Sequence, residues 1–388
     1  MTLVELLAAA RSGAPLRAIG LMSGTAADGI DAALVTLWRE AEWPCARLEA
    51  FHTFPYPPAV RAALFDAFAG KATVRDLCRL QVEVGEAFAG AAEALLAEAG
   101  VARIDFVASH GQTIWHEPPG SLQWGEPSLL AERLGCVVVA DFRPRDLAAG
   151  GQGAPLIPYV DWLLFRHADR TRAVQNIGGM ANVTCLPGGA GPEEVIAFDT
   201  GPGNAPIDAA VAAITAGRER FDRDGALAAA GSVDAQWLRR LMAHPFFHQP
   251  PPKSCGREQF GSAWVHDLAA AGLQGNDLVA TLTALVVESI ADAYRRWLPP
   301  VDEVIVGGGG ARNGVLMRWL ADRLAPARIL THEAFGWNSD AKEALGFAIL
   351  GYETLAERPA SLPAVTGARH PVILGKIVPG PPDRSARP

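Results

Sequence analysis

The sequence predicts two mixed α/β domains of similar architecture, and three observations support this fold class. The length of 388 residues suits two domains of roughly 150–200 residues each. Three short apolar runs precede the first helical pattern, and three more runs, divided by glycines, recur later. Helices, a strand, a helix and another strand follow each set, without any residue-level repeat. We place the domains at residues 1–140 and 141–388, facing one another across a cleft that suits a nucleotide.

The strands that open each domain are read from apolar runs bounded by turn residues. In order along the chain they are Leu16–Met22, Ile30–Leu37, Cys45–Phe54, Arg172–Ile177, Ala181–Leu186 and Val195–Phe198. Three strands without an intervening helix imply an antiparallel start to each sheet. The later alternation of strands with helices implies parallel strands.

The remaining elements follow from periodicity and flanking residues. Helical patterns cover Pro58–Ala69 and Thr73–Ala99, and the second is followed by Gly100 as a C-cap. Continuous apolar runs at Asp105–Ser109 and Cys136–Ala140 are typical of strands buried on both faces. The second domain closes with a helix at Asp277–Trp297, a strand at Glu303–Val306, a helix from about Arg312, a strand near Arg328–Thr331 and a helix at Asp340–Leu355.

Composition excludes several classes of protein. The net charge of −8 argues against a non-specific nucleic-acid binder, because such proteins need a surplus of Lys and Arg. The five cysteines are dispersed and form no C-x-x-C pair, which indicates reduced thiols rather than a disulfide framework or a zinc site. The N-terminus lacks a basic region, and the longest apolar stretch, Leu278–Val287, is too short to span a bilayer. We therefore expect a cytoplasmic protein that binds neither nucleic acid nor membrane.

A glycine- and hydroxyl-rich loop, Ser23–Asp31, lies between the first two predicted strands. Its glycines allow backbone N–H groups to approach an anion, and its hydroxyls add donors. Asp28 and Asp31 are unfavourable beside a bare phosphate unless a divalent cation bridges nucleotide and protein, and Asp28 is the first candidate for a Mg²⁺ ligand. The competing interpretation is an ordinary hairpin turn rich in Gly and Asp.

A second glycine-rich loop, Gly307–Asn313, follows a buried strand and opens a helix. We expect that its four consecutive glycines do not serve packing and instead let a flat ligand or a phosphate lie on the backbone. A flexible linker is the alternative, which conflicts with the packed elements on either side. The loop matches neither the P-loop nor the dinucleotide-binding fingerprint.

Asp199 ends a predicted strand and precedes a helix that starts near Asn204. Ligands bind at the carboxyl ends of strands in open α/β sheets, and a carboxylate there can act as a general base. The alternative is a structural Asp that caps a helix or turn. The turn at Gly178 and Gly179 is a second possible phosphate contact, although an ordinary hairpin is the favoured interpretation from the sequence.

Three further polar segments are of interest, and the one around Gln112 and Thr113 suits a hydroxyl-rich ligand. Gln112 and Thr113 follow an apolar run, and Arg143 can pair with a carboxylate or a phosphate. A structural histidine at His110 and a local salt bridge for Arg143 are the alternatives. The segment 250–258 is a rigid proline-rich loop with two cations, or no more than a surface connection.

Together these loops resemble the anhydro-N-acetylmuramic acid kinase family. The likeness runs from about Ile19 to Leu350 and includes MSGTAADGIDAAL, SHGQTIWHEP, DFRPRDLAAGGQGAPLIP, NIGGMANVT, FDTGPGNAPIDA, PPPKSCGREQF and VGGGGARN in the family's order. The resemblance implies two RNase-H-like domains of the actin/hexokinase type flanking an ATP cleft. It also implies a reaction in which the anhydro sugar, ATP and water give N-acetylmuramic acid 6-phosphate and ADP, in peptidoglycan recycling.

The resemblance assigns roles residue by residue. Asp199 matches the catalytic aspartate, the first loop matches the phosphate loop and the second loop corresponds to the adenosine side. Together with the turn at 178–179, the expected ATP contacts are Gly24, Thr25, Ala26, Ala27, Asp28, Gly29, Ile30, Asp31, Gly178, Gly179, Gly308, Gly309 and Asn313. The expected sugar contacts are Gln112, Thr113 and Arg143. A homodimer is expected.

One departure and two rival functions complete the sequence-based picture. The family commonly has Ser-Leu where this chain has Ala26 and Ala27, so a hydroxyl near the phosphates is lost while backbone donors remain. The first rival is a plain sugar kinase of the same fold, and the second is a non-enzymatic actin-like nucleotide switch. Which of Asp28, Asp31 and Asp199 binds the metal and which acts as base stays open on sequence alone.

Overall fold

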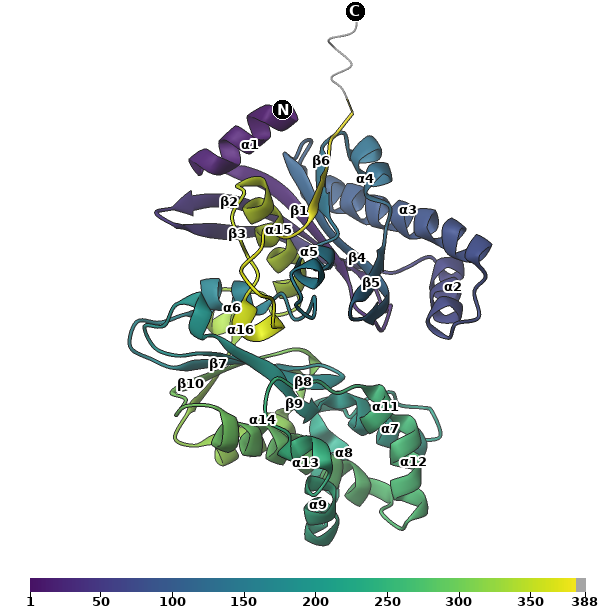
Figure 1. The fold of residues 1–388 in the computed structure, drawn as a ribbon. Helices are drawn as coiled ribbons and strands as arrows, with labels where there is room; N and C mark the ends of the chain where they lie inside the picture. The colour runs from purple at the N-terminus through teal and green to yellow at the C-terminus, as the bar shows by residue number, and fades with distance from the viewer. Residues whose placement is uncertain (382–388) are drawn as a thin grey trace, which may run out of the picture. The chain divides into compact units, whose positions relative to one another are not determined.

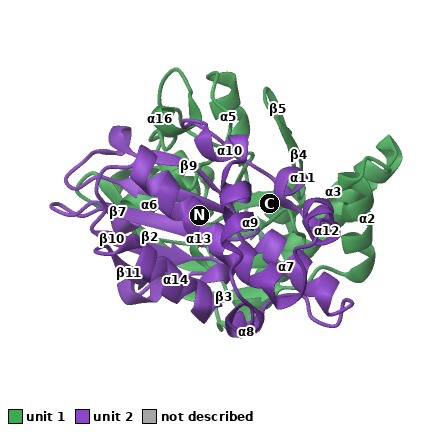
Figure 2. Cartoon of the chain, turned by 90° about the horizontal axis from the view of Figure 1, so that it is seen from below, with its two compact units in different colours: residues 1–163, 341–388 green, residues 164–340 purple. Residues whose placement is uncertain are grey.

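The computed structural model describes residues 1–381 and divides the chain into two compact units (Figures 1 and 2). Unit 1 combines Met1–Leu163 with the described part of Ala341–Pro388, and unit 2 is Leu164–Asp340. This division differs from the expected boundary at residue 140, because the chain returns to unit 1 after unit 2. Local periodicity did not reveal that return, in which the helix Lys342–Leu355 packs on a sheet built from the first strands.

Unit 1 is built around a seven-stranded sheet with the strand order β12-β6-β4-β1-β2-β3, to which β5 is added beside β4. Its elements are α1 (Leu3–Ser12), β1 (Leu16–Ser23), β2 (Ile30–Glu40), β3 (Trp43–Phe54), α2 (Pro58–Phe68), α3 (Val74–Glu98), β4 (Phe106–Glu117), β5 (Gly120–Trp124), α4 (Pro127–Leu134), β6 (Val137–Ala140), α5 (Arg143–Ala148), α6 (Pro158–Phe165), α15 (Lys342–Leu355), α16 (Pro363–Thr366) and β12 (Lys376–Val378). The first division between the units falls within α6. Strands β1, β4 and β6 are parallel, whereas β2, β3, β5 and β12 each pair antiparallel to a neighbour.

Two helical layers enclose the sheet of unit 1. The residues of α2, α3 and α4 join the core on one face, with Leu64, Phe88 and Leu130 fully buried. Helix α15 packs against β1, β2 and β4, and every residue of it except Glu343 is buried. This burial on all sides explains the continuous apolar character of the helix in the sequence.

Unit 2 is built around a five-stranded sheet with the strand order β11-β10-β7-β8-β9. Its elements are β7 (Arg172–Ile177), β8 (Met180–Leu186), β9 (Ile196–Pro202), α7 (Asn204–Ile214), α8 (Ala226–Ala230), α9 (Ala235–Met242), α10 (Pro245–His248), α11 (Arg257–Phe260), α12 (Ser262–Ala270), α13 (Gly275–Trp297), β10 (Glu303–Gly307), α14 (Gly314–Leu324) and β11 (Arg328–Thr331). Strand β8 is antiparallel to β7 and β9, and β7, β10 and β11 are parallel. Helices α7, α13 and α14 share one core with this sheet.

The two sheets share one topology, which confirms the predicted fold class. With β5 and β12 left out, the order across the sheet is β3-β2-β1-β4-β6 in unit 1 and β9-β8-β7-β10-β11 in unit 2. In each of these sheets only the second strand along the chain, β2 or β8, is antiparallel to the other four. This arrangement is that of RNase-H-like domains. Strands β5 and β12 are additions to it in unit 1 that were not predicted from the sequence.

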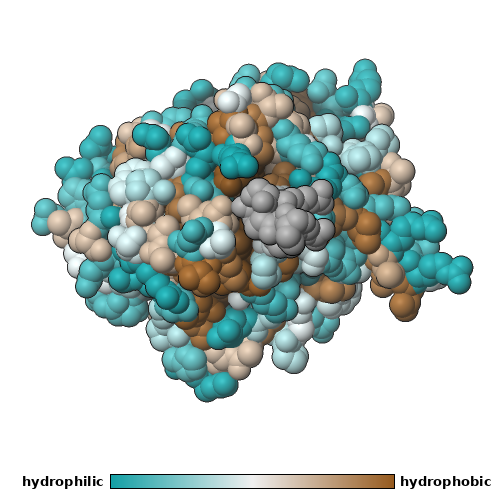
Figure 3. Space-filling view, turned by 90° about the horizontal axis from the view of Figure 1, so that it is seen from above, coloured by the Kyte–Doolittle hydropathy of each residue, from teal (hydrophilic) through white to brown (hydrophobic). Residues whose placement is uncertain are grey.

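Hydrophobic residues form separate patches among hydrophilic ones on the face of the molecule drawn in Figure 3. No helix within residues 1–381 combines the length and the apolar character needed to cross a bilayer.

Candidate active site

The first glycine-rich loop connects β1 to β2 in unit 1, as predicted. The Ser23 hydroxyl donates to the Gly29 carbonyl at 2.7 Å, and the Ala27 amide donates to the Gly24 carbonyl at 3.0 Å. These bonds close the loop on itself, and Ala27 adopts the left-handed φ of 47°. Ser23 is therefore a structural residue of the loop, and Thr25 is the hydroxyl that stays exposed.

Gln112, predicted to hold the sugar, instead braces this loop. Its Nε2 donates to the Gly24 carbonyl at 3.0 Å and to the Thr113 carbonyl at 3.3 Å. Its Oε1 accepts a hydrogen bond from the Tyr56 hydroxyl at 3.0 Å, and burial raises the pKa of Tyr56 well above its usual range. Because Gln112 is fully buried and both N–H groups of its side-chain amide are engaged, the side chain holds the loop in place from within unit 1.

The two aspartates of the loop differ in their surroundings. Asp31 accepts a hydrogen bond from the Thr53 hydroxyl at 2.6 Å, whereas Asp28 is exposed at the loop tip. Within residues 1–381 no group of three or more His, Cys, Asp or Glu side chains is arranged to hold a metal ion. One exposed carboxylate fits Mg²⁺, which usually keeps several waters and binds one or two carboxylates plus phosphate oxygens.

The departure at positions 26 and 27 also has a structural setting. Ala27 is fully buried in the core of unit 1, while Ala26 is half-buried. The Arg61 side chain donates to the Ala27 carbonyl at 2.9 Å. The methyl group at position 27 therefore anchors the loop, and the missing hydroxyl concerns position 26 alone.

Arg143, the second candidate sugar contact, lies at the start of α5 against His110. Its Nε donates to His110 Nε2 at 3.1 Å, and its Nη1 donates to the Gly153 carbonyl at 2.8 Å. Burial, together with the charge of Arg143, holds the pKa of His110 well below its usual range, so the imidazole is neutral. Burial raises the pKa of the neighbouring Glu343, which the charges of Lys342 and Arg143 oppose. The alternative of a salt bridge from Arg143 to Asp141 or Asp146 is not what the structure shows.

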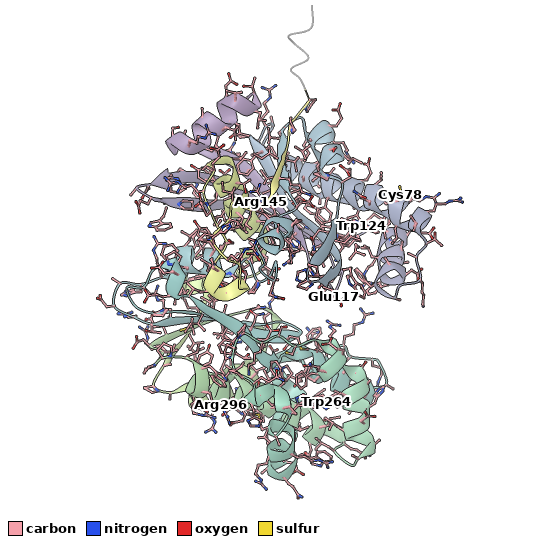
Figure 4. The ribbon with its side chains drawn as sticks, in the orientation of Figure 1. Cys78, Glu117, Trp124, Arg145, Trp264 and Arg296 are labelled. Carbon is pink, nitrogen blue, oxygen red and sulfur yellow. The ribbon has the colours of Figure 1, made fainter. Side chains whose placement is uncertain are left out.

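A polar pocket of about 410 Å³ lies beside the middle of β4 and the carboxyl end of β6 in unit 1. Its lining is Gln81, Ser109, His110, Gly111, Ser121, Leu122, Gln123, Trp124, Gly125, Glu126, Pro127, Ala140, Asp141, Pro144 and Lys376. Figure 4 labels Trp124 in this part of unit 1. The buried Ser109 hydroxyl lacks a hydrogen-bond partner among the residues that the structure describes. The pocket therefore offers a hydroxyl-rich ligand a donor that the protein leaves unused.

Asp199, the predicted general base, lies in β9 of unit 2. Its backbone N–H donates to the Lys253 carbonyl at 3.1 Å, and its Oδ2 accepts from the Cys255 amide at 2.9 Å. Burial raises the pKa of Asp199 to about 6, although the Cys255 hydrogen bond and the charge of Lys253 oppose the rise. A carboxylate with this pKa is ionised at neutral pH and still basic enough to accept a proton.

Lys253 comes from the proline-rich segment and was not among the predicted site residues. Its Nζ is buried, donates to the Phe246 carbonyl at 3.2 Å and lies 4.6 Å from the centre of the Phe246 ring. Burial lowers the pKa of this amine. The sequence signal was the pair of cations in a rigid loop, but only the fold shows that the loop reaches Asp199.

The second glycine-rich loop, between β10 and α14, corrects the expectation that its glycines do not serve packing. A Cβ on Gly308 would lie 2.6 Å from Asn176 Oδ1, and one on Gly310 would lie 2.6 Å from Ile177 Cβ. A Cβ on Gly307 would lie 3.0 Å from the Ser339 hydroxyl. Three of the four glycines thus permit close approach to neighbouring elements. Gly309 has more room, with its nearest neighbour, Asn204 Nδ2, at 3.4 Å from such a Cβ.

Asn313 is a helix cap in this structure. Its Oδ1 accepts hydrogen bonds from the amides of Val315 and Leu316 at 3.1 and 3.0 Å, so it satisfies the first turn of α14. A contact of Asn313 with the adenosine stays a prediction.

Known proteins match this chain over most of its length. The family model described as anhydro-N-acetylmuramic acid kinase matches residues 16–380. The chain belongs to the anhydro-N-acetylmuramic acid kinase family. Two relatives that carry this name come from Caldanaerobacter subterraneus subsp. tengcongensis, at 46% identity over 92% of this chain and 96% of the relative, and from Gloeobacter violaceus, at 47% identity over 94% and 99%.

Solved structures were also compared with this member of the anhydro-N-acetylmuramic acid kinase family. Component A of the (R)-2-hydroxyglutaryl-CoA dehydratase of Acidaminococcus fermentans matches with a TM-score of 0.45 at 14% identity, over 88% of this chain and 99% of that one. A ROK hexokinase from Thermus thermophilus matches with a TM-score of 0.34 at 16% identity, over 85% and 97%.

Proposed function

We propose that the chain is an ATP-dependent kinase that opens 1,6-anhydro-N-acetylmuramic acid with water and phosphorylates its 6-oxygen. The products are N-acetylmuramic acid 6-phosphate and ADP, as peptidoglycan recycling requires. The observation that carries the proposal is Asp199, a buried carboxylate whose pKa is raised by burial to about 6. It lies in the middle of β9 rather than at the end of a strand as expected, because β9 continues to Pro202. The family match over residues 16–380 supports the same substrate in preference to a plain sugar kinase or a nucleotide switch.

Asp199 is proposed to start the reaction as a general base. It accepts a proton from the water that attacks the anomeric carbon, and the bond from that carbon to the 6-oxygen breaks with its electron pair on oxygen. The 6-oxygen then attacks the γ-phosphorus in line. The bond from that phosphorus to the bridging oxygen breaks, and ADP leaves with the electron pair. The Cys255 amide keeps one oxygen of Asp199 fixed throughout.

The ATP contacts are proposed on the loops described above. The loop from Gly24 to Asp31 would hold the phosphates through its backbone amides, and Gly178 and Gly179 would add to them. Gly308, Gly309 and Asn313 would lie on the adenosine side. Asp28 would hold Mg²⁺, which neutralises charge on the phosphate oxygens when it is bound.

The sugar contacts are proposed in unit 1. Arg143 retains Nη2 for a carboxylate or carbonyl oxygen, since its Nε and Nη1 are engaged. Thr113 lies in the same strand as the residues that line the polar pocket of unit 1. Gln112 is proposed to support the phosphate loop rather than the sugar, because both of its donors already have partners.

Two further parts of the proposal concern the whole protein. We propose a homodimer, for which the exposed Trp115 and Leu122, paired across β4 and β5, offer apolar surface. We propose a cytoplasmic location, because all five cysteines are free thiols. Sedimentation analysis of the purified chain tests the first, and fractionation of cells that express it tests the second.

One coupled assay tests the reaction. ADP release is measured with 1,6-anhydro-N-acetylmuramic acid and with N-acetylglucosamine, in ¹⁸O-labelled water, with early time points to control for exchange. We expect release only with the anhydro sugar, and label on the anomeric oxygen of the product. Release without any sugar would favour a nucleotide switch, and product without anomeric label would favour a plain kinase. Asp199→Asn serves as the inactive control.

A further inference from the structure

The segment 250–261 of unit 2 has no part yet in the proposed reaction beyond its contact with Asp199. The Lys253 carbonyl accepts a hydrogen bond from the Asp199 backbone N–H at 3.1 Å, and the Cys255 amide donates one to the Asp199 carboxylate at 2.9 Å. The residues that follow are therefore fixed close to the base. Among them is Arg257, the first residue of α11.

Helix α11 is short but firmly anchored by Phe260. This side chain is fully buried, with its ring centre 5.7 Å from that of Phe247 and 5.4 Å from that of Trp264, which Figure 4 labels. Aromatic packing of this kind limits the movement of the one-turn helix. Arg257 thus extends from a rigid support.

The guanidinium of Arg257 lies at the turn between β7 and β8. A Cβ placed on Gly179 would be 3.4 Å from Nη2 and 3.6 Å from Nε of Arg257. Arg257 is exposed, and its side chain has no hydrogen-bond or ion-pair partner among residues 1–381. An unengaged guanidinium next to a proposed phosphate contact is available for an external anion.

The backbone of the same turn does not oppose an anion. The Gly178 carbonyl accepts from the Asn204 amide at 2.7 Å, and the Gly179 carbonyl accepts from the Ala205 amide at 3.0 Å. Both oxygens are therefore directed to the start of α7. Neither carbonyl oxygen therefore points toward a phosphate bound beside Arg257.

Asp208 on α7 provides a carboxylate near this cation. Burial raises the pKa of Asp208 to about 6, and the charge of Arg257 opposes the rise, so the two side chains are electrostatic neighbours. They form no ion pair within 4.0 Å. The charge of Arg257 is therefore not paired with the Asp208 carboxylate.

We propose that Arg257 binds the γ-phosphoryl group of ATP at the Gly178–Gly179 turn and stabilises its charge during transfer to the 6-oxygen. The proposal rests on the proposed function, and it adds a catalytic residue to that site. A planar guanidinium matches the geometry of phosphoryl oxygens with two parallel hydrogen bonds. It also offsets the repulsion that Asp199 and Asp208 would exert on the nucleotide.

Calorimetry with ADP and with a non-hydrolysable ATP analogue, both with Mg²⁺, tests the proposal. The variants are Arg257→Gln, Arg257→Lys and, as a matched control, Arg220→Gln at an exposed arginine of the same unit. We expect Arg257→Gln to lower the affinity for the ATP analogue by about 10-fold or more, because the contact with the γ-phosphoryl group is lost. The affinity for ADP, which lacks that group, should change by less than about 2-fold. Arg257→Lys should recover part of the loss, and Arg220→Gln should change neither affinity.

The turnover number should fall by about 10³-fold in Arg257→Gln, at the lower end of the range for arginines that stabilise a transferring phosphoryl group. Equal weakening of ADP and analogue, or weakening of neither, would overturn the proposal. If the wild-type chain releases no ADP in response to the anhydro sugar, the proposed function fails. The comparison of the two nucleotides still decides the role of Arg257 in that case.

Discussion

At the scale of single residues, Asp199 is subject to opposing influences on its pKa. Burial disfavours its charged form, while the Cys255 amide and Lys253 favour it, and the balance leaves a pKa of about 6. The base must be deprotonated to work. We therefore expect kcat/KM to fall about tenfold per pH unit below pH 6 and to level off above it. A pH profile of sugar-dependent ADP release measures this, and a profile flat down to pH 5 would contradict it.

The same pKa predicts an effect on stability. Because the folded-state pKa lies above that of an unfolded Asp, the charged carboxylate destabilises the fold, and this penalty develops as pH rises from about 4 to 6. Asp199→Asn should therefore abolish turnover and yet raise the free energy of unfolding at pH 7.5 by about 1–3 kcal/mol. The gain should nearly vanish at pH 3.5. Denaturant titrations at the two pH values, with nucleotide affinity as the control for an intact site, check both parts.

The glycines of the second loop make a matched pair for a residue-scale test. Gly308 has a φ of 79° and would bring a Cβ to 2.6 Å from Asn176, whereas Gly309 has room. We expect Gly308→Ala to lower the free energy of unfolding by about 1–3 kcal/mol. Gly309→Ala should leave stability within about 0.5 kcal/mol and instead raise the KM for ATP. Equal losses of stability in both variants would show that packing alone explains the loop.

At the scale of elements, the β1–β2 hairpin is held by a side chain from β4. Gln112→Leu would remove the side-chain hydrogen bonds of Gln112 to the Gly24 carbonyl and from the Tyr56 hydroxyl, so the loop would lose the support of β4. We expect the KM for ATP to rise about 5- to 50-fold while the KM for the sugar stays within about 2-fold. Thr113→Val is the companion variant, for which only the KM for the sugar should rise. If Gln112→Leu raised the KM for the sugar more than the KM for ATP, Gln112 would be a sugar contact, as the sequence analysis expected.

The elements also show what the sequence can and cannot predict. Strands β1, β7 and β10 and helices α3 and α13 were predicted within a few residues, because their periodicity and flanking glycines are local properties. The roles of Gln112, Asn313 and Gly308 depend on partners such as Gly24, Leu316 and Asn176 that no local pattern identifies. Arg257 was read only as a cation in a loop for the same reason.

At the scale of the whole molecule, the resemblance of seven motifs predicted the family, and the repeated pattern of apolar runs predicted the duplicated architecture. The expected domain boundary at residue 140 differs from the division that the structure shows. Unit 2 is one continuous stretch, 164–340, with its own hydrophobic core. Unit 1 needs both ends of the chain, because α15 covers β1, β2 and β4. Such a discontinuous unit cannot be recognised from elements taken one at a time.

This division predicts how fragments behave. We expect 164–340 to unfold cooperatively when expressed alone, and 1–163 to remain unfolded or aggregated because one face of its sheet lacks α15. Joining 1–163 to 341–388 through a short Gly-Ser linker should restore folding. The two ends to be joined lie close together, because Asp161 and Lys342 form an ion pair at 3.0 Å. Circular dichroism and thermal melts of the three proteins compare them. A stable, cooperatively folded 1–163 would contradict the assignment of α15.

The late position of α15 has a consequence for the newly made chain on the ribosome. The first 163 residues emerge without the helix that covers one face of their sheet, and the roughly 180 residues of unit 2 must be translated before that helix appears. At bacterial or eukaryotic speeds this takes roughly 10–35 s. During that interval the apolar strands β1, β2 and β4 are exposed and unit 2 completes its own core first. The nested order of the chain thus leaves apolar surface on the nascent N-terminal half, of the kind that chaperones bind, until α15 is made.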